Sequence, residues 1–256
     1  MKKISDLLSS FERTQRPNPK IIGTPRSRGS SSPESQKADR GCKRCIGGFR
    51  LRERDGFEGV VECPCRKRRR YRGIVPQHFA KFNLGRLKPQ PARHPLQADA
   101  IAALQADPHA SYLLCGRNGA GKSLMGWCLL RQAVCESRRV VGINLAVLLD
   151  QYRALEKPLR EEEALPPRPR ITALDLEGPR NWFLLLQEFD KPRPTEYASE
   201  RLFELVDMAF NYEHQLVITS NMDADELDAH WSTSSPRFGR SIMSRLRETC
   251  VQVNLF

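Results

Sequence analysis

The sequence predicts an α/β protein in which a parallel sheet is flanked by helices. Two observations support this class: short apolar runs alternate with amphipathic stretches from about residue 95 onward, and a glycine-rich turn joins one such run to a helical stretch. The chain has 256 residues, enough for one medium domain or two small ones. The predicted strands are 111–115, 140–144, 182–187, 215–220 and 250–255.

Helix candidates alternate with these strands. Residues 124–134 follow the glycine-rich turn, and residues 198–210 carry apolar side chains at helical spacing. Asp223 and Glu226 form a capping-box pattern at the start of the stretch 223–231. Strands and helices therefore alternate along the chain, as they do in parallel α/β folds.

The glycine-rich turn fits the phosphate-loop pattern G-x-x-x-x-G-K-[ST] at every defined position. A strand precedes it and a helix follows, so the helix N-terminus favours a bound anion. Lys122 is expected to reach the β- and γ-phosphate oxygens, and the Ser123 hydroxyl to bind magnesium. The sequence therefore predicts an ATP and magnesium site, against the alternative of a glycine-rich turn with a stray lysine. The loop comprises Gly116, Arg117, Asn118, Gly119, Ala120, Gly121, Lys122 and Ser123.

The end of the strand 182–187 carries the candidate catalytic acid. An acidic pair at such a strand end normally holds magnesium, but the first position here is Gln187, which brings no charge to the metal. Glu188 is the candidate base or water-orienting group, with an exposed strand-end carboxylate as the alternative. Asp190 would share its face if the strand continued, and would partly replace the missing acid. We therefore expect ATP binding with weak hydrolysis.

Two further residues are candidates for the same site. Asn221 follows the strand 215–220 at the edge of the sheet where ligands bind, so it is placed to contact the γ-phosphate or the attacking water. An ordinary polar turn explains Asn221 equally well. Arg245 falls in a stretch that fits a helix, and its spacing alone indicates a solvated basic face.

Four cysteines in a short segment suggest a zinc site. Cys42 and Cys45 are separated by two residues, and Cys63 and Cys65 by one, which gives four thiolates for tetrahedral zinc. The residues 46–62 between the pairs fit a hairpin too small to fold without a staple. We expect zinc rather than free thiols in a reducing compartment. The other cysteines are expected to be buried small hydrophobes: Cys115, Cys128, Cys135 and Cys250.

Positive charge is concentrated toward the N-terminus. Residues 1–100 hold 24 Lys and Arg against 9 Asp and Glu, whereas residues 101–256 hold 18 against 21. The run 66–72 alone carries six positive charges around Tyr71. Such a run favours the phosphates and bases of a nucleic acid, with a solvated basic linker as the alternative.

These patterns predict three parts. Residues 1–40 hold a short amphipathic helix and a linker rich in Arg, Pro, Ser and Gly that we expect to be disordered. Residues 41–72 form the zinc-binding basic knuckle, and residues 73–256 the α/β domain. The apolar runs are far too short for a bilayer and no export signal is evident, so we expect no membrane partner and a cytoplasmic location.

Together these motifs resemble those of the DnaC/DnaI-type replicative helicase loaders and the related IstB-like ATPases, a branch of the AAA+ class. The resemblance covers roughly residue 42 to the C-terminus. Phage and prophage loaders often combine a cysteine knuckle with a basic run and a stretch like 73–79 here. The other segments that carry the resemblance are 116–123, 183–188, 194–197, 218–221 and 242–246.

The resemblance implies an AAA+ P-loop domain in which Glu188 serves catalysis, Asn221 acts as sensor and Arg245 reaches the nucleotide of a neighbouring subunit. Gln187 departs from the family's usual Asp. The implied function is ATP-dependent placement of a hexameric DnaB-type helicase on single-stranded DNA during replication initiation, with self-association through the ATP sites. An IstB-like transposition helper and a non-hydrolysing, ATP-gated DNA-binding adaptor are the alternatives.

Overall fold

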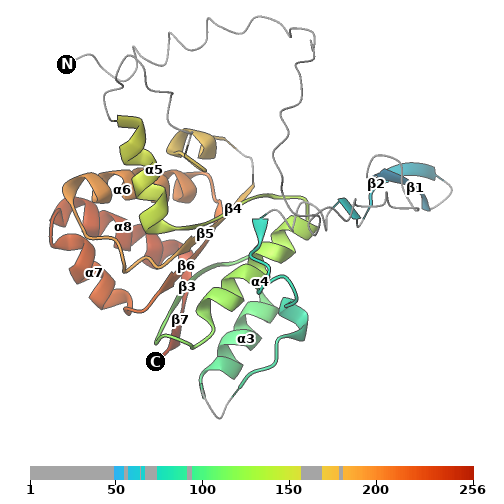
Figure 1. The fold of residues 1–256 in the computed structure, drawn as a ribbon, viewed down its shortest axis with the longest axis horizontal. Helices are drawn as coiled ribbons and strands as arrows, with labels where there is room; N and C mark the ends of the chain where they lie inside the picture. The colour runs from blue at the N-terminus through green and yellow to red at the C-terminus, as the bar shows by residue number, and fades with distance from the viewer. Residues whose placement is uncertain are drawn as a thin grey trace, which may run out of the picture. The chain divides into compact units, whose positions relative to one another are not determined.

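A five-stranded parallel sheet lies at the centre of the unit Cys42–Phe256 (Figure 1). The structure is a computed structural model that describes residues 49–54, 57–63, 65–66, 74–90, 94–156, 169–178 and 181–256. Each of the five predicted strands is present, with bounds within one residue of the prediction, so the predicted α/β class is confirmed. The strands are β3 (Ser111–Gly116), β4 (Arg139–Asn144), β5 (Trp182–Gln187), β6 (Gln215–Ser220) and β7 (Cys250–Leu255).

The strand order β4-β5-β6-β3-β7 places β3 and β6 side by side. Both strands are buried along their whole length, which explains why they read as continuous apolar runs in the sequence. The chain leaves β3 for the far edge at β4 and returns through β5 and β6, so the strand order reverses beside β3. Ligands of open parallel sheets bind at the carboxyl ends of the strands near such a reversal.

Helices cover both faces of the sheet. The helices α3 (Gln97–Ala106) and α4 (Lys122–Cys135) contribute to one hydrophobic cluster, and the remaining four helices contribute to the other (Figure 1). No helix in the described part of the chain is both long and apolar enough to cross a bilayer. The other helices are α5 (Leu145–Glu156), α6 (Glu196–Asn211), α7 (Ala224–Ser232) and α8 (Pro236–Thr249), with 3-10 turns at η2 (Leu84–Arg86) and η3 (Ala173–Leu176).

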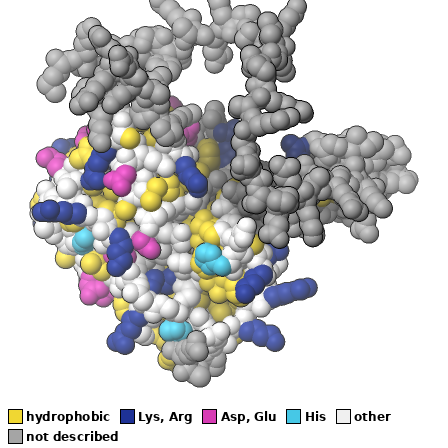
Figure 2. Space-filling view, viewed as in Figure 1, with side chains coloured by type: hydrophobic (Ala, Val, Ile, Leu, Met, Phe, Trp, Pro, Cys, Tyr) yellow, Lys and Arg dark blue, Asp and Glu magenta, His cyan; other side chains and the backbone are white. Residues whose placement is uncertain are grey.

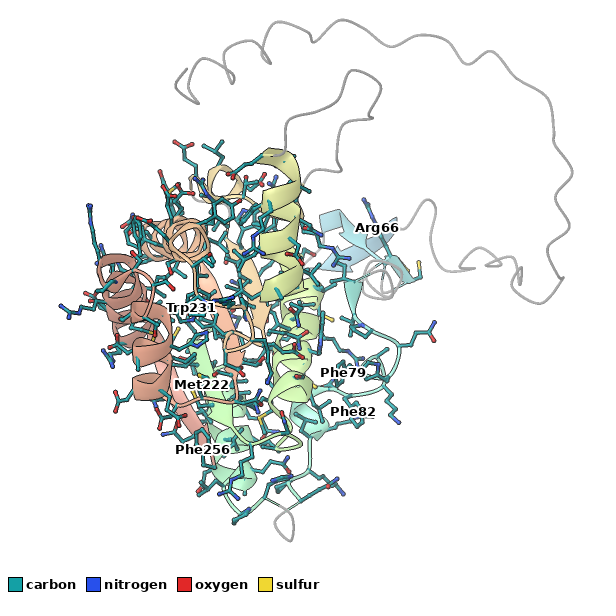
Figure 3. All side chains as sticks on the ribbon, turned by 60° about the vertical axis from the view of Figure 1, so that its left-hand side comes forward. Arg66, Phe79, Phe82, Met222, Trp231 and Phe256 are labelled. Carbon is teal, nitrogen blue, oxygen red and sulfur yellow. The ribbon has the colours of Figure 1, made fainter. Side chains whose placement is uncertain are left out.

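The segment 74–90 packs against the outer side of α4. The Phe79 ring lies 6.2 Å from the Trp127 ring, and the Arg131 guanidinium donates to the carbonyl oxygen of Phe82. Figure 3 shows Phe79 and Phe82 beside this helix, whereas Trp231, a buried residue of α7, belongs to the hydrophobic cluster on the opposite face of the sheet. The segment that leads into the domain is thereby part of its core.

Residues 49–62 contain the expected hairpin. The strands β1 (Phe49–Arg54) and β2 (Phe57–Glu62) pair antiparallel, with Phe49 opposite Glu62. Cys63 follows β2 and is buried, and Cys65 is half-buried. Cys42 and Cys45 lie outside the described residues, as does the expected helix and linker of 1–40, so the zinc knuckle and the N-terminal part stay predictions.

The expectation that all four cysteines of the α/β domain are buried is wrong for Cys135. Cys115 and Cys128 are buried, and burial raises the pKa of each thiol to about 12. Cys135 is the last residue of α4 and is exposed, because the buried side of the helix end is taken by Ala133 and Val134. Cys250, at the start of β7, is half-buried.

Lys and Arg side chains are dispersed over the face of the molecule shown in Figure 2, and they do not gather into one patch there. Of the basic run 66–72, only Arg66 belongs to the described residues, and it is exposed. Contact between this run and a nucleic acid therefore stays a prediction.

Candidate functional site

The phosphate loop joins the carboxyl end of β3 to the first turn of α4. Gly116, Gly119 and Gly121 have φ angles of +151°, +85° and +94°, which glycine adopts without the strain that a side chain would cause. A Cβ atom on Gly116 would lie 2.6 Å from the backbone oxygen of Leu255. Gly121 is the N-cap of α4, so unpaired amides of the first turn face the loop. The loop therefore has the backbone form of an anion site.

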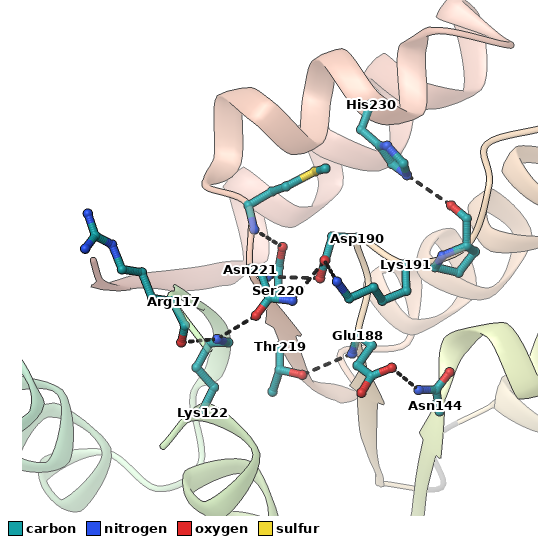
Figure 4. Close-up of polar contacts among 12 residues, drawn as sticks. Arg117, Lys122, Asn144, Glu188, Asp190, Lys191, Thr219, Ser220, Asn221 and His230 are labelled. Atoms are coloured by element: carbon teal, nitrogen blue, oxygen red, sulfur yellow. Dashed lines mark hydrogen bonds and ion pairs between the residues drawn. The ribbon is translucent and has the colours of Figure 1, made fainter. Parts of the chain in front are cut away.

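Lys122 joins this loop to the neighbouring strand (Figure 4). Its ammonium nitrogen donates to the carbonyl oxygens of Gly116 at 2.5 Å and Arg117 at 2.9 Å, and to Oδ1 of Asn221 at 3.0 Å. The residue is only 8% exposed. Burial lowers the pKa of the Lys122 ammonium, and the nearby Asp190 carboxylate partly offsets that effect. A positive charge is thus fixed at the mouth of the loop, next to the predicted sensor.

Asp190 fixes the orientation of Asn221. Its Oδ1 accepts the backbone N–H of Asn221 at 2.9 Å, and its Oδ2 accepts Nδ2 of the same residue at 3.0 Å. Because the amide nitrogen is donated to Asp190, the amide oxygen faces Lys122. Burial acts to raise the pKa of the Asp190 carboxyl, but the two hydrogen bonds from Asn221 and the cation of Lys191 outweigh it, so the pKa lies below its usual range.

Glu188 stands at the turn that ends β5. Its φ of +56° turns the chain out of the strand, so the strand does not continue to Asp190 as the sequence had allowed. The Glu188 backbone N–H donates to Oγ1 of Thr219 at 3.2 Å, and its exposed carboxylate accepts Nδ2 of Asn144 at 2.5 Å. Asn144 ends β4, so the carboxylate is held toward the β4 side of the sheet edge (Figure 4).

A cavity of about 290 Å³ brings most of the predicted site together. It lies between the phosphate loop and the ends of β5 and β6, and Asp190 reaches it through the turn after Glu188. Gln187 does not line this cavity; it lines a separate groove with Trp127 and Gly142. A larger hollow of about 620 Å³ lies at the amino ends of the strands, away from the loop amides. The residues that line the phosphate cavity include Asn118, Gly119, Gly121, Lys122, Ser123, Glu188, Asp190 and Asn221.

Arg245 lies away from the phosphate cavity, on α8. Its Nε donates to Oδ1 of Asp207 on α6 at 3.0 Å, and its guanidinium carbon lies 4.5 Å from the centre of the Phe210 ring. The side chain is about one-third exposed. A role at the nucleotide of a neighbouring subunit stays a prediction.

The cavity offers oxygen ligands suited to magnesium. The Ser123 hydroxyl and the carboxylates of Glu188 and Asp190 line it together, and hard oxygen donors are the ligands that magnesium prefers. Within the described residues, no group of three or more His, Cys, Asp or Glu side chains is arranged to hold a metal ion. Since Cys42 and Cys45 lie outside those residues, the zinc prediction is not tested.

Among the residues of the site that were not predicted, two position Glu188. Thr219 fixes the backbone of Glu188, and Asn144 holds its carboxylate. Asn144 could have been found from its position, because it ends an apolar strand at the same sheet edge as Glu188. The contact of Asn144 with Glu188 depends on β4 and β5 being neighbours, which the sequence does not state.

The chain resembles solved structures in its fold. The crystal structure of the DnaC helicase loader matches this chain with a TM-score of 0.52 and 16% sequence identity, covering 71% of this chain and 100% of that one. The chain has the AAA+ fold of DnaC. DnaI matches with a TM-score of 0.51 and 13% identity, covering 71% of this chain and 95% of that one. No protein-family model and no curated protein matches the chain. At these identities the likeness concerns the AAA+ fold alone.

Proposed function

We propose that this chain is an ATP-dependent loader that binds a hexameric, DnaB-type replicative helicase and places it on single-stranded DNA. The observation that carries the proposal is the buried Lys122 ammonium in a phosphate loop, hydrogen-bonded to Asn221 beside the cavity. The shared fold with DnaC, which is a helicase loader, supports the choice of client. The excess of basic residues in 1–100 supports a nucleic-acid partner.

ATP acts in this proposal mainly as a switch for assembly. Two features favour slow hydrolysis: Gln187 is uncharged and lines a different groove, and the Glu188 carboxylate is hydrogen-bonded to Asn144. Copies of the chain associate through their ATP sites, with Arg245 completing the neighbour's site. Binding energy then shifts the chain toward its helicase-loading assembly, because a ligand favours the state to which it binds more tightly.

The N-terminal part supplies the remaining contacts in this proposal. Zinc held by Cys42, Cys45, Cys63 and Cys65 staples the hairpin β1–β2, and the basic run 66–72 contacts DNA or the helicase. A ratio of one zinc per chain in the purified protein supports this part, and a chain without metal that retains its hairpin contradicts it.

The direct test is a loading assay with purified candidate helicase and circular single-stranded DNA. Helicase retained on the circles is measured with ATP, with ADP and without nucleotide, for the wild type and Lys122→Ala. Arg139→Ala is the matched control, because it removes a positive charge from an exposed residue at the start of β4. We expect ATP-dependent loading that Lys122→Ala abolishes and Arg139→Ala leaves intact. Equal loading with and without ATP, and by the wild type and Lys122→Ala, contradicts the proposal.

A second candidate is an ATP-gated DNA adaptor that does not hydrolyse ATP. It is favoured because the uncharged Gln187 lines a groove separate from the phosphate cavity. A turnover assay with single-stranded DNA present separates the two. Measurable turnover that Glu188→Gln abolishes favours the weakly hydrolysing loader. DNA binding that depends on ATP, without turnover and without helicase retention, favours the adaptor.

A further inference from the structure

Gln97 lies behind the phosphate loop and joins it to the segment before α3. It is the first residue of that helix and is 8% exposed. Its Oε1 accepts the backbone N–H of Gln90 at 2.7 Å, and its Nε2 donates to the carbonyl oxygen of Ala120 at 3.0 Å. Both ends of a buried amide are therefore used, one of them on a carbonyl inside the phosphate loop.

The contact with the loop is close. A Cβ atom on Gly121 would lie 2.8 Å from Nε2 of Gln97, so the amide rests against the glycine that caps α4. Ala120 is itself only 1% exposed. Gln97 is not among the residues that line the phosphate cavity. Any effect of Gln97 on a ligand there is exerted through the loop.

The orientation of one peptide group follows from this bond. The Ala120–Gly121 peptide is planar and trans, so its C=O and N–H point in opposite directions. Because the carbonyl oxygen of Ala120 is held on the Gln97 side, the Gly121 N–H points away from Gln97, and Gly121 lines the phosphate cavity whereas Ala120 does not. Backbone N–H groups turned inward in this way are the donors with which such loops bind phosphate.

We infer that Gln97 is a positioning residue for the triphosphate, because its N–H donor fixes the Ala120–Gly121 peptide in the orientation that phosphate binding requires. This inference rests on the ATP binding of the proposed function. The active element is the donor and not the volume of the side chain: a methionine fills similar space but cannot hold the carbonyl oxygen.

The test compares Gln97→Glu and Gln97→Met with Gln105→Met. Gln105 is the matched control, because it lies on the same helix and its Nε2 donates to the carbonyl oxygen of Leu84 at 2.7 Å, away from the loop. Affinity for a fluorescent, non-hydrolysable ATP analogue with magnesium is measured on the full chain, and thermal unfolding checks the fold. We expect both Gln97 variants to bind about tenfold more weakly at pH 7.5, the loss that corresponds to one hydrogen bond. Gln105→Met should bind like the wild type.

The pH dependence separates positioning from packing. The carboxyl introduced by Gln97→Glu donates only when it is protonated, so the affinity of this variant relative to the wild type should recover as the pH falls toward 5. The affinity of Gln97→Met relative to the wild type should stay constant. If Gln97→Met does not fold, the pH series of Gln97→Glu decides.

Each outcome bears on a different statement. Weak binding by Gln97→Glu that recovers at low pH supports the inference. If the wild type and Gln97→Glu bind the analogue equally well at pH 7.5, the inference about Gln97 is overturned and the proposed ATP binding stands. A loss of affinity with no recovery at low pH, in a folded variant, also overturns it. A wild type that does not bind the analogue overturns the proposed ATP binding together with it.

Discussion

Asp190→Asn is predicted to destabilise the fold because it deprives Asn221 of an acceptor. The Asp190 carboxylate accepts both the backbone N–H and Nδ2 of Asn221, and the residue is 7% exposed. The introduced amide has a single acceptor oxygen, so one donor of Asn221 faces another donor. Asn221 is half-buried, but the donor left without a partner faces the buried Asp190 side chain, where such a loss costs about 1–3 kcal/mol, and we take about 2 kcal/mol.

Thermal unfolding followed by circular dichroism measures this cost. A domain of this size loses about 2–4 °C per kcal/mol, so Asp190→Asn should lower the Tm by about 4–8 °C at pH 7. Glu188→Gln is the control: its carboxylate is exposed, and such a surface change shifts stability by only about 0.5 kcal/mol. A Tm equal to that of the wild type would show that Asn221 does not need both acceptor oxygens of Asp190.

The pH dependence provides a second readout of the same bond. The pKa of Asp190 is lower in the folded chain than its usual value of about 3.9. The stabilisation from its charge is therefore fully present above that usual value and disappears as the pH falls through the lower, folded pKa. The Tm difference between wild type and Asp190→Asn should be constant near neutrality and shrink below about pH 4. A difference that grows on acidification contradicts the assignment.

Three further predictions concern the site and the core. Asn144→Ser keeps a side-chain oxygen for the start of α5 but is too short to hold Glu188. This variant should raise ATP turnover between about twofold and tenfold in a coupled assay. Unchanged turnover would show that this hydrogen bond does not restrain Glu188. Gly239→Ala should lower the free energy of unfolding, measured by urea denaturation, by about 1–3 kcal/mol, because the new Cβ would lie 2.6 Å from the backbone nitrogen of Ser232. Gly85→Ala is the control and should have little effect, because nothing lies closer than 3.7 Å to its new Cβ. Equal urea midpoints for Gly239→Ala and the wild type would contradict the close approach of α7 and α8. Iodoacetamide at pH 8 should alkylate Cys135 in the native protein, read by mass spectrometry, and leave the buried thiols of Cys115 and Cys128 unmodified, since their pKa values are raised to about 12.

The sheet could be predicted from the sequence because its central strands are buried on both faces. Such strands are short, continuous apolar runs, and β3 and β6 have this pattern. The helix α6 was recognisable from its amphipathic spacing, and the Asp223 cap of α7 from its pairing with Glu226. In each case the signal lies within a few neighbouring residues.

Two helices were not predicted, for different reasons. The helix α5 begins directly after β4, and Asn144 alone separates the apolar residues of the strand from the apolar run 145–149. The side chain of Asn144 is the start signal, because its Oδ1 accepts the backbone N–H of Ala146. The helix α3 is rich in alanine and therefore has a weak apolar face, although it packs against β7, η2 and α4. Periodicity cannot separate such helices from loops or strands.

In the candidate site, too, the features encoded by neighbouring residues were predictable and the long-range contacts were not. The phosphate loop was predictable because its conformation is encoded in eight consecutive residues. The network of Lys122, Asn221 and Asp190 was only partly predictable, because it depends on β3 lying beside β6. The bond from Gln97 to Ala120 joins residues that no motif connects. Long-range pairing of strands and helices decides these contacts, and a single sequence does not contain that information in local form.

The most direct test of the account is the affinity of the full chain for an ATP analogue in the presence of magnesium, measured by calorimetry. We predict one analogue bound per wild-type chain, and binding about 10- to 100-fold weaker in Lys122→Ala, the loss that corresponds to a charge-assisted hydrogen bond to phosphate. Arg139→Ala should bind like the wild type. Equal affinity of the wild type and a folded Lys122→Ala would contradict the account, because the triphosphate would then lie outside the loop 116–123.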